Sequence, residues 1–152
     1  MSLAIAIALH TLAAILWVGG MFFAYSCLRP SMGALDAPVR CRLWRESLGR
    51  FFTVVWVCIA ILLISGFAMI GMLGGMAASG PHIHIMMALG FLMMALFMHV
   101  QFGPFRKLKL AVGAQDWAEA GKQIGRIRPV VAINLTLGLI AAAAGSGGRW
   151  LG

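Results

Sequence analysis

Four long apolar runs, separated by polar or glycine-rich stretches, dominate the pattern of this sequence. They lie at about residues 2–28, 51–73, 81–105 and 129–146. A helix needs about 20 consecutive apolar residues to cross the hydrocarbon core of a bilayer, and each run is close to that length or longer. Each run is also far too long for a strand. We therefore predict an all-α fold, a polytopic four-helix transmembrane bundle that forms a single domain over residues 1–152.

Local signals mark the ends of these predicted helices. The pair Arg29-Pro30 is expected to close the first helix, because proline removes a backbone donor and disfavours a helical residue before it. Pro81 suits the first turn of the third helix, where a missing N–H has no intrahelical partner. The segments 31–50 and 103–128 are predicted to be polar, basic loops that contain short helical pieces.

The composition agrees with a membrane protein. Of the 152 residues, 62% are hydrophobic and 11% are charged, and the mean hydropathy is +0.96. Soluble domains contain about 45–50% apolar residues and about 25% charged residues. These values exclude an ordinary soluble domain.

The net charge of +8 comes from basic residues that are concentrated in two connections. Five of the twelve basic residues lie between the first and second apolar runs and six lie between the third and fourth, whereas segment 74–81 carries no charge. By the positive-inside rule, both basic connections face the cytoplasm and both termini face the periplasm. Anionic lipid head groups suffice as partners for this charge, so the lipid bilayer and not nucleic acid is the predicted partner.

The candidate chemistry lies on one face of each of two helices. Three residues spaced by seven and four positions fall within about 20° of one line down the first helix: His10, Trp17 and Met21. The third helix is expected to place four residues on a common inward face: His84, Phe91, Met98 and His99. Because an ionisable residue inside an apolar helix is costly, each histidine in these runs is a candidate functional residue.

Two facing histidines from separate helices are the ligand set of a six-coordinate haem. We predict that His10 and His84 are the axial ligands of a haem b, and His99 with Met21 forms a second candidate pair of the His/Met type. His82 lies about 160° around the helix from His84, so it is predicted to lie at the water interface.

The surroundings of such a haem follow from the same two faces. Trp17 and Phe91 are expected to pack near the macrocycle, and Arg29 is a candidate partner for a propionate. This first hypothesis describes a small electron-transfer protein with a partner protein or a quinone as redox partner. It leaves open whether the protein is an oxidoreductase enzyme.

Eleven methionines support a second hypothesis, in which the metal is copper. Soft thioethers suit Cu(I), and imidazole suits copper generally. The candidate ligands crowd one end of the predicted bundle: Met72, Met76, His82, His84, Met86 and Met87. A third hypothesis is a structural or assembly subunit whose histidines only pack, and a homo-oligomer is compatible with all three.

Motifs in the first and last helices resemble one family. Three motifs are similar to the opening helix of the CopD-like bacterial inner-membrane proteins: Leu9-His10, Leu16-Trp17-Val18-Gly19-Gly20 and Leu28-Arg29-Pro30. Three others are similar to its final helix: Arg128-Pro129, Asn134 and Leu137-Gly138-Leu139. The resemblance implies a multi-pass protein of the bacterial inner (cytoplasmic) membrane and a role in copper uptake or resistance.

A more distant resemblance is to the HemJ-type protoporphyrinogen oxidases, four-helix membrane proteins that hold haem b. The shared feature is a histidine seven residues before a tryptophan, here His10 and Trp17. Where those enzymes have Leu-His-x-Lys at the start of the third helix, this sequence has Ile-His-Ile-Met at residues 83–86. The resemblance implies haem binding and adds a HemJ-like protoporphyrinogen oxidase as an alternative function, from which this sequence departs by lacking the lysine.

The charge distribution yields a test of the topology. A fusion of alkaline phosphatase to Gly152 should be active, because that enzyme works only in the periplasm, where the positive-inside rule puts the C-terminus. A fluorescent-protein fusion at the same residue should stay dark. Cytoplasmic activity at Gly152 would contradict the predicted orientation.

Overall fold

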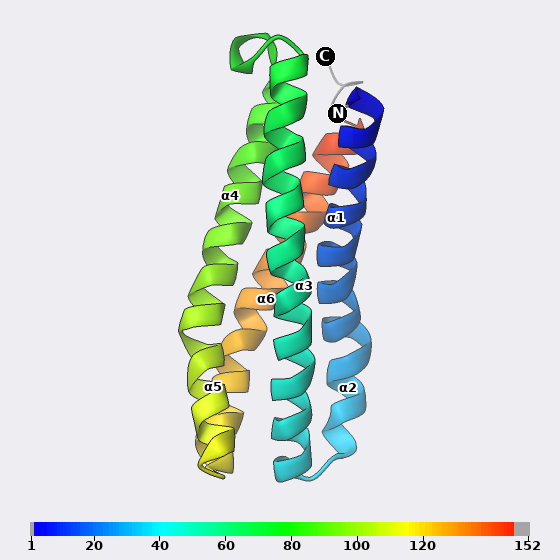
Figure 1. The fold of residues 1–152 in the computed structure, drawn as a ribbon. Helices are drawn as coiled ribbons and strands as arrows, with labels where there is room; N and C mark the ends of the chain where they lie inside the picture. The colour runs from blue at the N-terminus through cyan, green and yellow to red at the C-terminus, as the bar shows by residue number, and fades with distance from the viewer. Residues whose placement is uncertain (1, 148–152) are drawn as a thin grey trace.

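The computed structural model describes residues 2–147, and they form an all-α bundle (Figure 1). Within this range, four helical stretches are long and apolar enough to cross a membrane: Leu3–Ala34, Ala37–Met72, Pro81–Gly113 and Trp117–Gly147. The predicted all-α, four-helix architecture is confirmed. The side of the membrane that each end faces stays a prediction, and Gly152, the site of the topology fusion, lies outside the described residues.

The first helix is longer than its sequence signals predicted. Helix α1 spans Leu3–Phe23 and continues through a π-helical turn at Ala24–Leu28 into α2, Arg29–Ser31. The prediction that Arg29-Pro30 closes the helix is therefore wrong. Proline cannot donate to the carbonyl four residues before it and crowds that carbonyl, and the wider π-helical turn lies where this conflict is relieved. A 3-10 turn at Met32–Ala34 then ends the stretch.

The two predicted basic loops are largely helical. Helix α3 spans Ala37–Met72 and α6 spans Trp117–Gly147, so both begin well before the expected residues 51 and 129. Charged residues mark where the membrane ends, but Arg, Lys and Glu are good helix formers and do not end a helix. At about 1.5 Å per residue, the 36 residues of α3 extend about 54 Å, well beyond a hydrocarbon core of about 30 Å.

The third stretch bends once. Helix α4 spans Pro81–Phe102 and begins at the predicted proline, whereas its end precedes the expected residue 105. Gly103 then redirects the chain into α5, Pro104–Gly113. We call the end of the bundle that holds the loop 73–80 the uncharged end. The opposite end, where α5 and the first turns of α3 and α6 lie, is the basic end (Figure 1).

Helix α6 organises the packing, because it contacts α1, α3, α4 and α5. Helix α1 packs mainly against α3, and α4 packs mainly against α6. As a result α1 and α4 lie on opposite sides of the bundle, with α3 and α6 between them (Figure 1).

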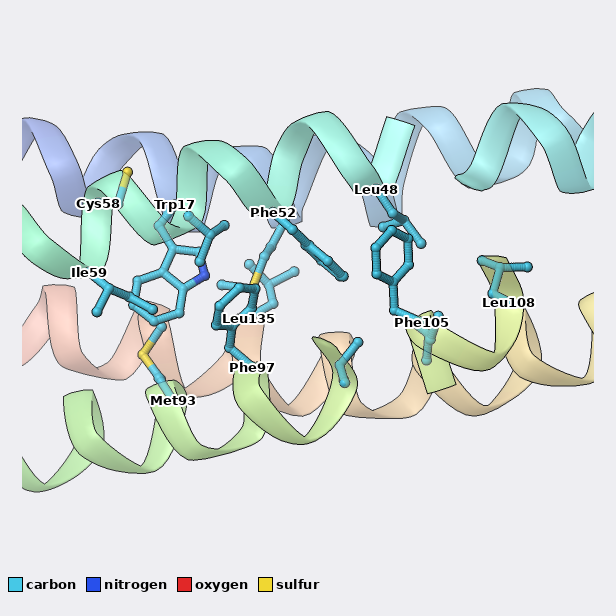
Figure 2. Packing of buried hydrophobic residues seen from close by; sticks show 14 of the residues in the cluster. Trp17, Leu48, Phe52, Cys58, Ile59, Met93, Phe97, Phe105, Leu108 and Leu135 are labelled. Atoms are coloured by element: carbon cyan, nitrogen blue, oxygen red, sulfur yellow. The ribbon is translucent and has the colours of Figure 1, made fainter. Parts of the chain in front are cut away.

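An aromatic cluster fills the centre of the bundle (Figure 2). The Phe97 ring of α4 makes edge-on contacts with Trp17 of α1 at 6.3 Å and with Phe52 of α3 at 5.3 Å, measured between ring centroids. A third such contact joins it to Trp56 at 5.3 Å, and Phe105 of α5 stacks edge-on against Phe52 at 4.8 Å. Such pairs add about 0.5–1.5 kcal/mol each beyond the burial of their area.

The close approach of α6 to α1 and α4 gives a stability prediction. A Cβ at Gly138 would lie 2.7 Å from Cγ2 of Val18 and 3.1 Å from Cε of Met93. Because the β-branched valine is stiff, Gly138→Ala should lower the free energy of unfolding by about 1–3 kcal/mol, measured by sodium dodecyl sulfate titration in mild detergent.

Gly19→Ala is the matched control, since a Cβ there meets nothing within 4 Å. An alanine in a helix interior is better than glycine by up to about 1 kcal/mol, so this variant should be as stable as the parent or more stable. Equal stability of the two variants would contradict the tight packing at Gly138.

Candidate functional site

The predicted face of the first helix is turned toward the bundle interior. Trp17 and Met21 are each only 2% exposed, and His10, two turns before Trp17, is half-buried. The indole of Trp17 lies among side chains of α3 and α4 (Figure 2). The line of three residues therefore runs from the uncharged end toward the middle of the bundle.

His10 has a defined partner on α3. Its Nδ1 lies 3.0 Å from Oγ of Ser65, and that hydroxyl donates to the carbonyl of Ile61 at 2.6 Å. Since a hydroxyl carries one proton, the proton of the His10–Ser65 bond belongs to Nδ1, and Ser65 accepts it. This assignment leaves the lone pair of the neutral imidazole on Nε2, which is the form that binds a metal.

The His10 ring lies in a notch of α3 at Ser65-Gly66. A Cβ at Gly66 would lie 3.4 Å from Cε1 of His10, so the glycine leaves just enough room for the ring. Ser65 itself is 1% exposed. Helix α3 thus supplies both the space and the hydrogen-bond acceptor that a buried imidazole needs.

The predicted inward face of the third helix is wrong. His84, Phe91, Met98 and His99 are all exposed on the outer surface of α4. The buried face carries Met93, Phe97 and Val100 instead. The physical reason is that almost every residue of α4 is apolar, so the sequence contains no polar face that identifies the opposite, inward one.

The face that does turn inward begins with the other histidine. His82 and Met86 are half-buried and lie on the same side of α4 as buried Met93. We call these three residues the interior stripe. His82, for which we predict a position at the water interface, is thus half-buried instead. Met93 is absent from the predicted sites, although its spacing of seven from Met86 and four from Phe97 indicates this face.

The two methionines of the interior stripe pack against two glycines of α6. A Cβ at Gly145 would lie 3.1 Å from Sδ of Met86, and a Cβ at Gly138 would lie 3.1 Å from Cε of Met93. The Met93 side chain points toward Trp17 and Ile59 (Figure 2). The interior stripe therefore runs from the uncharged end toward the aromatic cluster, with α6 packed directly on its methionines.

The other predicted copper ligands remain at the edge of the uncharged end. Met72 and Met76, at the end of α3 and in the following loop, are exposed, as is His84. Met87 is half-buried and lies off the interior stripe. Of the six residues proposed together, His82 and Met86 are half-buried on one side of α4, the His82 ring against Gly80 of the preceding loop and the Met86 thioether against Gly145 of α6.

The residues present do not fit a haem within one chain. His10 and His84 lie on helices that are not neighbours, and His84 points away from the bundle. The cavity in the core has a volume of about 20 Å³, which is room for one water molecule and not for a porphyrin. It lies beside Trp17 and Met21 and contains the unpartnered Oδ1 of Asn134 in its wall.

The other residues of the haem hypothesis also lie apart from one another. Phe91 is exposed on the outer surface of α4, away from buried Trp17. His99 lines a cleft at the basic end, whereas Met21 is in the core, so the two form no pair. The Arg29 guanidinium lies over the Tyr25 ring, 5.2 Å from its centroid.

Four apolar spans with a histidine and methionines turned inward define a small multi-pass α-helical membrane protein. The family profile described as copper resistance protein D (CopD) matches residues 45–146, which is 102 of the 152 residues. The chain belongs to this family, and the resemblance seen in the sequence is confirmed. The motifs of the final helix lie inside the matched region and those of the opening helix lie outside it. No curated protein and no solved structure matches the chain significantly.

The bond between His10 and Ser65 gives a second stability prediction. Ser65→Ala and His10→Ala should each lower the free energy of unfolding by about 1–3 kcal/mol, because each leaves a polar atom without its partner. In the double variant, the free energy of unfolding should fall by about 1 kcal/mol less than the sum of the two single losses, as measured in a double-mutant cycle.

Ser146→Ala serves as the control for the loss of a helix hydroxyl. Its Oγ is exposed, and its bonds to described residues go to carbonyls of its own helix, so the variant should stay within about 0.5 kcal/mol of the parent. Additive losses at His10 and Ser65 would show that the two side chains are not coupled.

Proposed function

We propose that this protein handles copper at the membrane and takes up Cu(I) as its cargo through the uncharged end of the bundle. The observation that carries this proposal is the interior stripe of His82, Met86 and Met93, which leads from that end into the core. Membership of the copper resistance protein D family supports the same conclusion.

The donor atoms of the interior stripe suit this cargo. Thioether sulfur is a soft ligand that favours Cu(I), and a neutral imidazole nitrogen binds copper in either oxidation state. A cation that leaves water for the interior of a bundle needs ligands that replace its hydration shell. His82 and Met86, one helical turn apart on one side of α4, are the imidazole and the thioether that we assign to the first ion site.

The exposed methionines give the ion a first contact. Met72 and Met76 lie at the end of α3 and in the loop before α4, close in sequence to the start of the interior stripe. In the orientation that the positive-inside rule predicts, this end faces the periplasm. The proposal therefore has copper approach from the periplasmic side, with His82 as the first ligand inside the bundle.

Copper is favoured over haem on geometric grounds. A six-coordinate haem needs two imidazoles that face each other across a gap wide enough for a porphyrin, whereas one Cu(I) ion needs only two or three donors on neighbouring turns. The core cavity of about 20 Å³ fits neither a porphyrin nor its substituents. An electron-transfer or oxidoreductase function rests on the haem and loses its support with it.

The two histidines at the start of α4 give the sharpest test, since they are two residues apart and lie on opposite faces. His82→Ala should weaken Cu(I) binding by about tenfold or more, because it removes an inward ligand, while His84→Ala should leave it nearly unchanged. Competition with a chromophoric Cu(I) chelator in detergent measures both affinities. An equal loss of Cu(I) affinity in the two variants, or a loss only in His84→Ala, would overturn the proposed site.

A matched pair of methionine variants separates sulfur ligation from packing. Met86→Leu keeps the volume and removes the sulfur, so Cu(I) binding should fall and X-ray absorption should report fewer sulfur neighbours. Met98→Leu makes the same change on the exposed face of α4 and should have no effect. A protein that binds haem stoichiometrically and no Cu(I) would contradict the proposal as a whole.

A further inference from the structure

A cleft with a volume of about 530 Å³ opens at the basic end between α4, α5 and α6. Its walls include side chains from all three helices: His99, Lys107, Gln123 and Arg126. The cleft lies at the opposite end of the bundle from His82 and Met86. It is therefore separate from the proposed copper site and independent of it.

The backbone creates this cleft. Gly103 and Pro104 end α4 and turn the chain into α5, which opens a gap beside α6. On the facing side, a Cβ at Gly125 would meet nothing within 4 Å, so the missing side chain leaves space. One turn later, Pro129 has no N–H, and the carbonyl of Gly125 loses the donor that a regular helix would give it.

The charge of the lining is positive. Lys107 of α5 and Arg126 of α6 both border the cleft, and no aspartate or glutamate does so among the described residues. Neither of the two cations takes part in the ion pairs found within residues 2–147, which join Arg45 to Glu46 and Lys122 to Glu119. Two cations from different helices around one cavity favour an anion, and an arginine with a lysine is a common arrangement for a phosphate group.

The cleft is also lined by residues with acceptor oxygens, which an ionised phosphodiester has no proton to bond. Gln123 is 0% exposed, its Nε2 donates to Oε1 of Glu119 at 2.5 Å, and its own Oε1 has no hydrogen-bond partner. Gln123 and Gly125, which carry these two oxygens, both line the cleft beside the two cations. The complementary ligand carries hydroxyl groups as well as a phosphate.

Exposed apolar side chains follow the cleft along α4 and α6, in the direction of the apolar spans. On α4, Leu92 lies two turns from His99 on the same side and is 48% exposed. On α6, Ile133 and Ile140 follow Pro129 on one face and are 53% and 49% exposed. A ligand with a phosphate in the cleft and hydrocarbon chains directed along these helices would cover both surfaces.

We propose that this cleft binds the head group of an anionic phospholipid that carries free hydroxyls, of the phosphatidylglycerol type. The phosphodiester lies between Lys107 and Arg126, and His99 adds a further polar contact at the edge. The head-group hydroxyls donate to Oε1 of Gln123 and to the carbonyl of Gly125. The acyl chains lie along Leu92, Ile133 and Ile140.

Native mass spectrometry of the full chain, titrated with dioleoylphosphatidylglycerol in detergent, tests the proposal. The parent should retain one lipid more tightly than any other, and Lys107→Gln with Arg126→Gln should weaken that binding by about tenfold or more. The matched control is Arg106→Gln with Arg128→Gln, which removes the same charge from the same two helices outside the cleft. This control should change the affinity by less than about threefold.

Gly125→Leu tests the cleft without changing the charge. The leucine fills open space and is a better helix former than glycine, so the variant should fold as well as the parent and bind the lipid less tightly. Equal losses in the two charge-removal variants would overturn the site in favour of general attraction to the basic end. Equal binding of dioleoylphosphatidylcholine would overturn its anion selectivity, and equally tight binding of glycerol phosphate or inorganic phosphate would overturn the assignment to a lipid.

Discussion

The packing of Phe97 fixes the rotation of α4 about its own axis. Its ring contacts Trp17 of α1 and both Phe52 and Trp56 of α3, so rotation of α4 would pull the ring out of the centre of the bundle. Because side-chain directions along a helix are fixed relative to one another, this one contact turns His82 and Met86 inward. The same rotation turns His84 toward the outside.

The two ends of the bundle differ in chemistry because they differ in charged residues. Toward the uncharged end, imidazole and thioether groups lie between closely packed helices, and α6 permits this packing through Gly138 and Gly145. Toward the basic end, α3, α5 and α6 continue beyond the apolar spans as charged helices. There the breaks at Gly103-Pro104 and Pro129 open a polar cleft instead of a packed interior.

Polar groups inside the bundle differ in whether a neighbouring group forms a hydrogen bond with them. His10 finds the hydroxyl of Ser65 on α3, which fixes one ring nitrogen as a donor and leaves the other as a base. Oδ1 of Asn134 and Oε1 of Gln123 have no hydrogen-bond partner within residues 2–147. The first lies beside a cavity large enough for one water molecule, and the second lies beside the cleft that we assign to a lipid head group.

The apolar runs and the residue spacings are enough to predict the all-α architecture, the four apolar spans, the inward face of α1 and the resemblance to the CopD family. These features depend on local composition and on spacing within one helix, which a sequence records directly. The predicted helix ends are wrong because the helices continue through Arg29-Pro30 and through the charged segments. The position of His82, and not His84, on the inner side of α4 follows from the packing of the helices and not from the sequence pattern. In a helix that is apolar on all sides, the inward face is set by which side chains fit against the neighbouring helices, and no pattern within the helix records that fit.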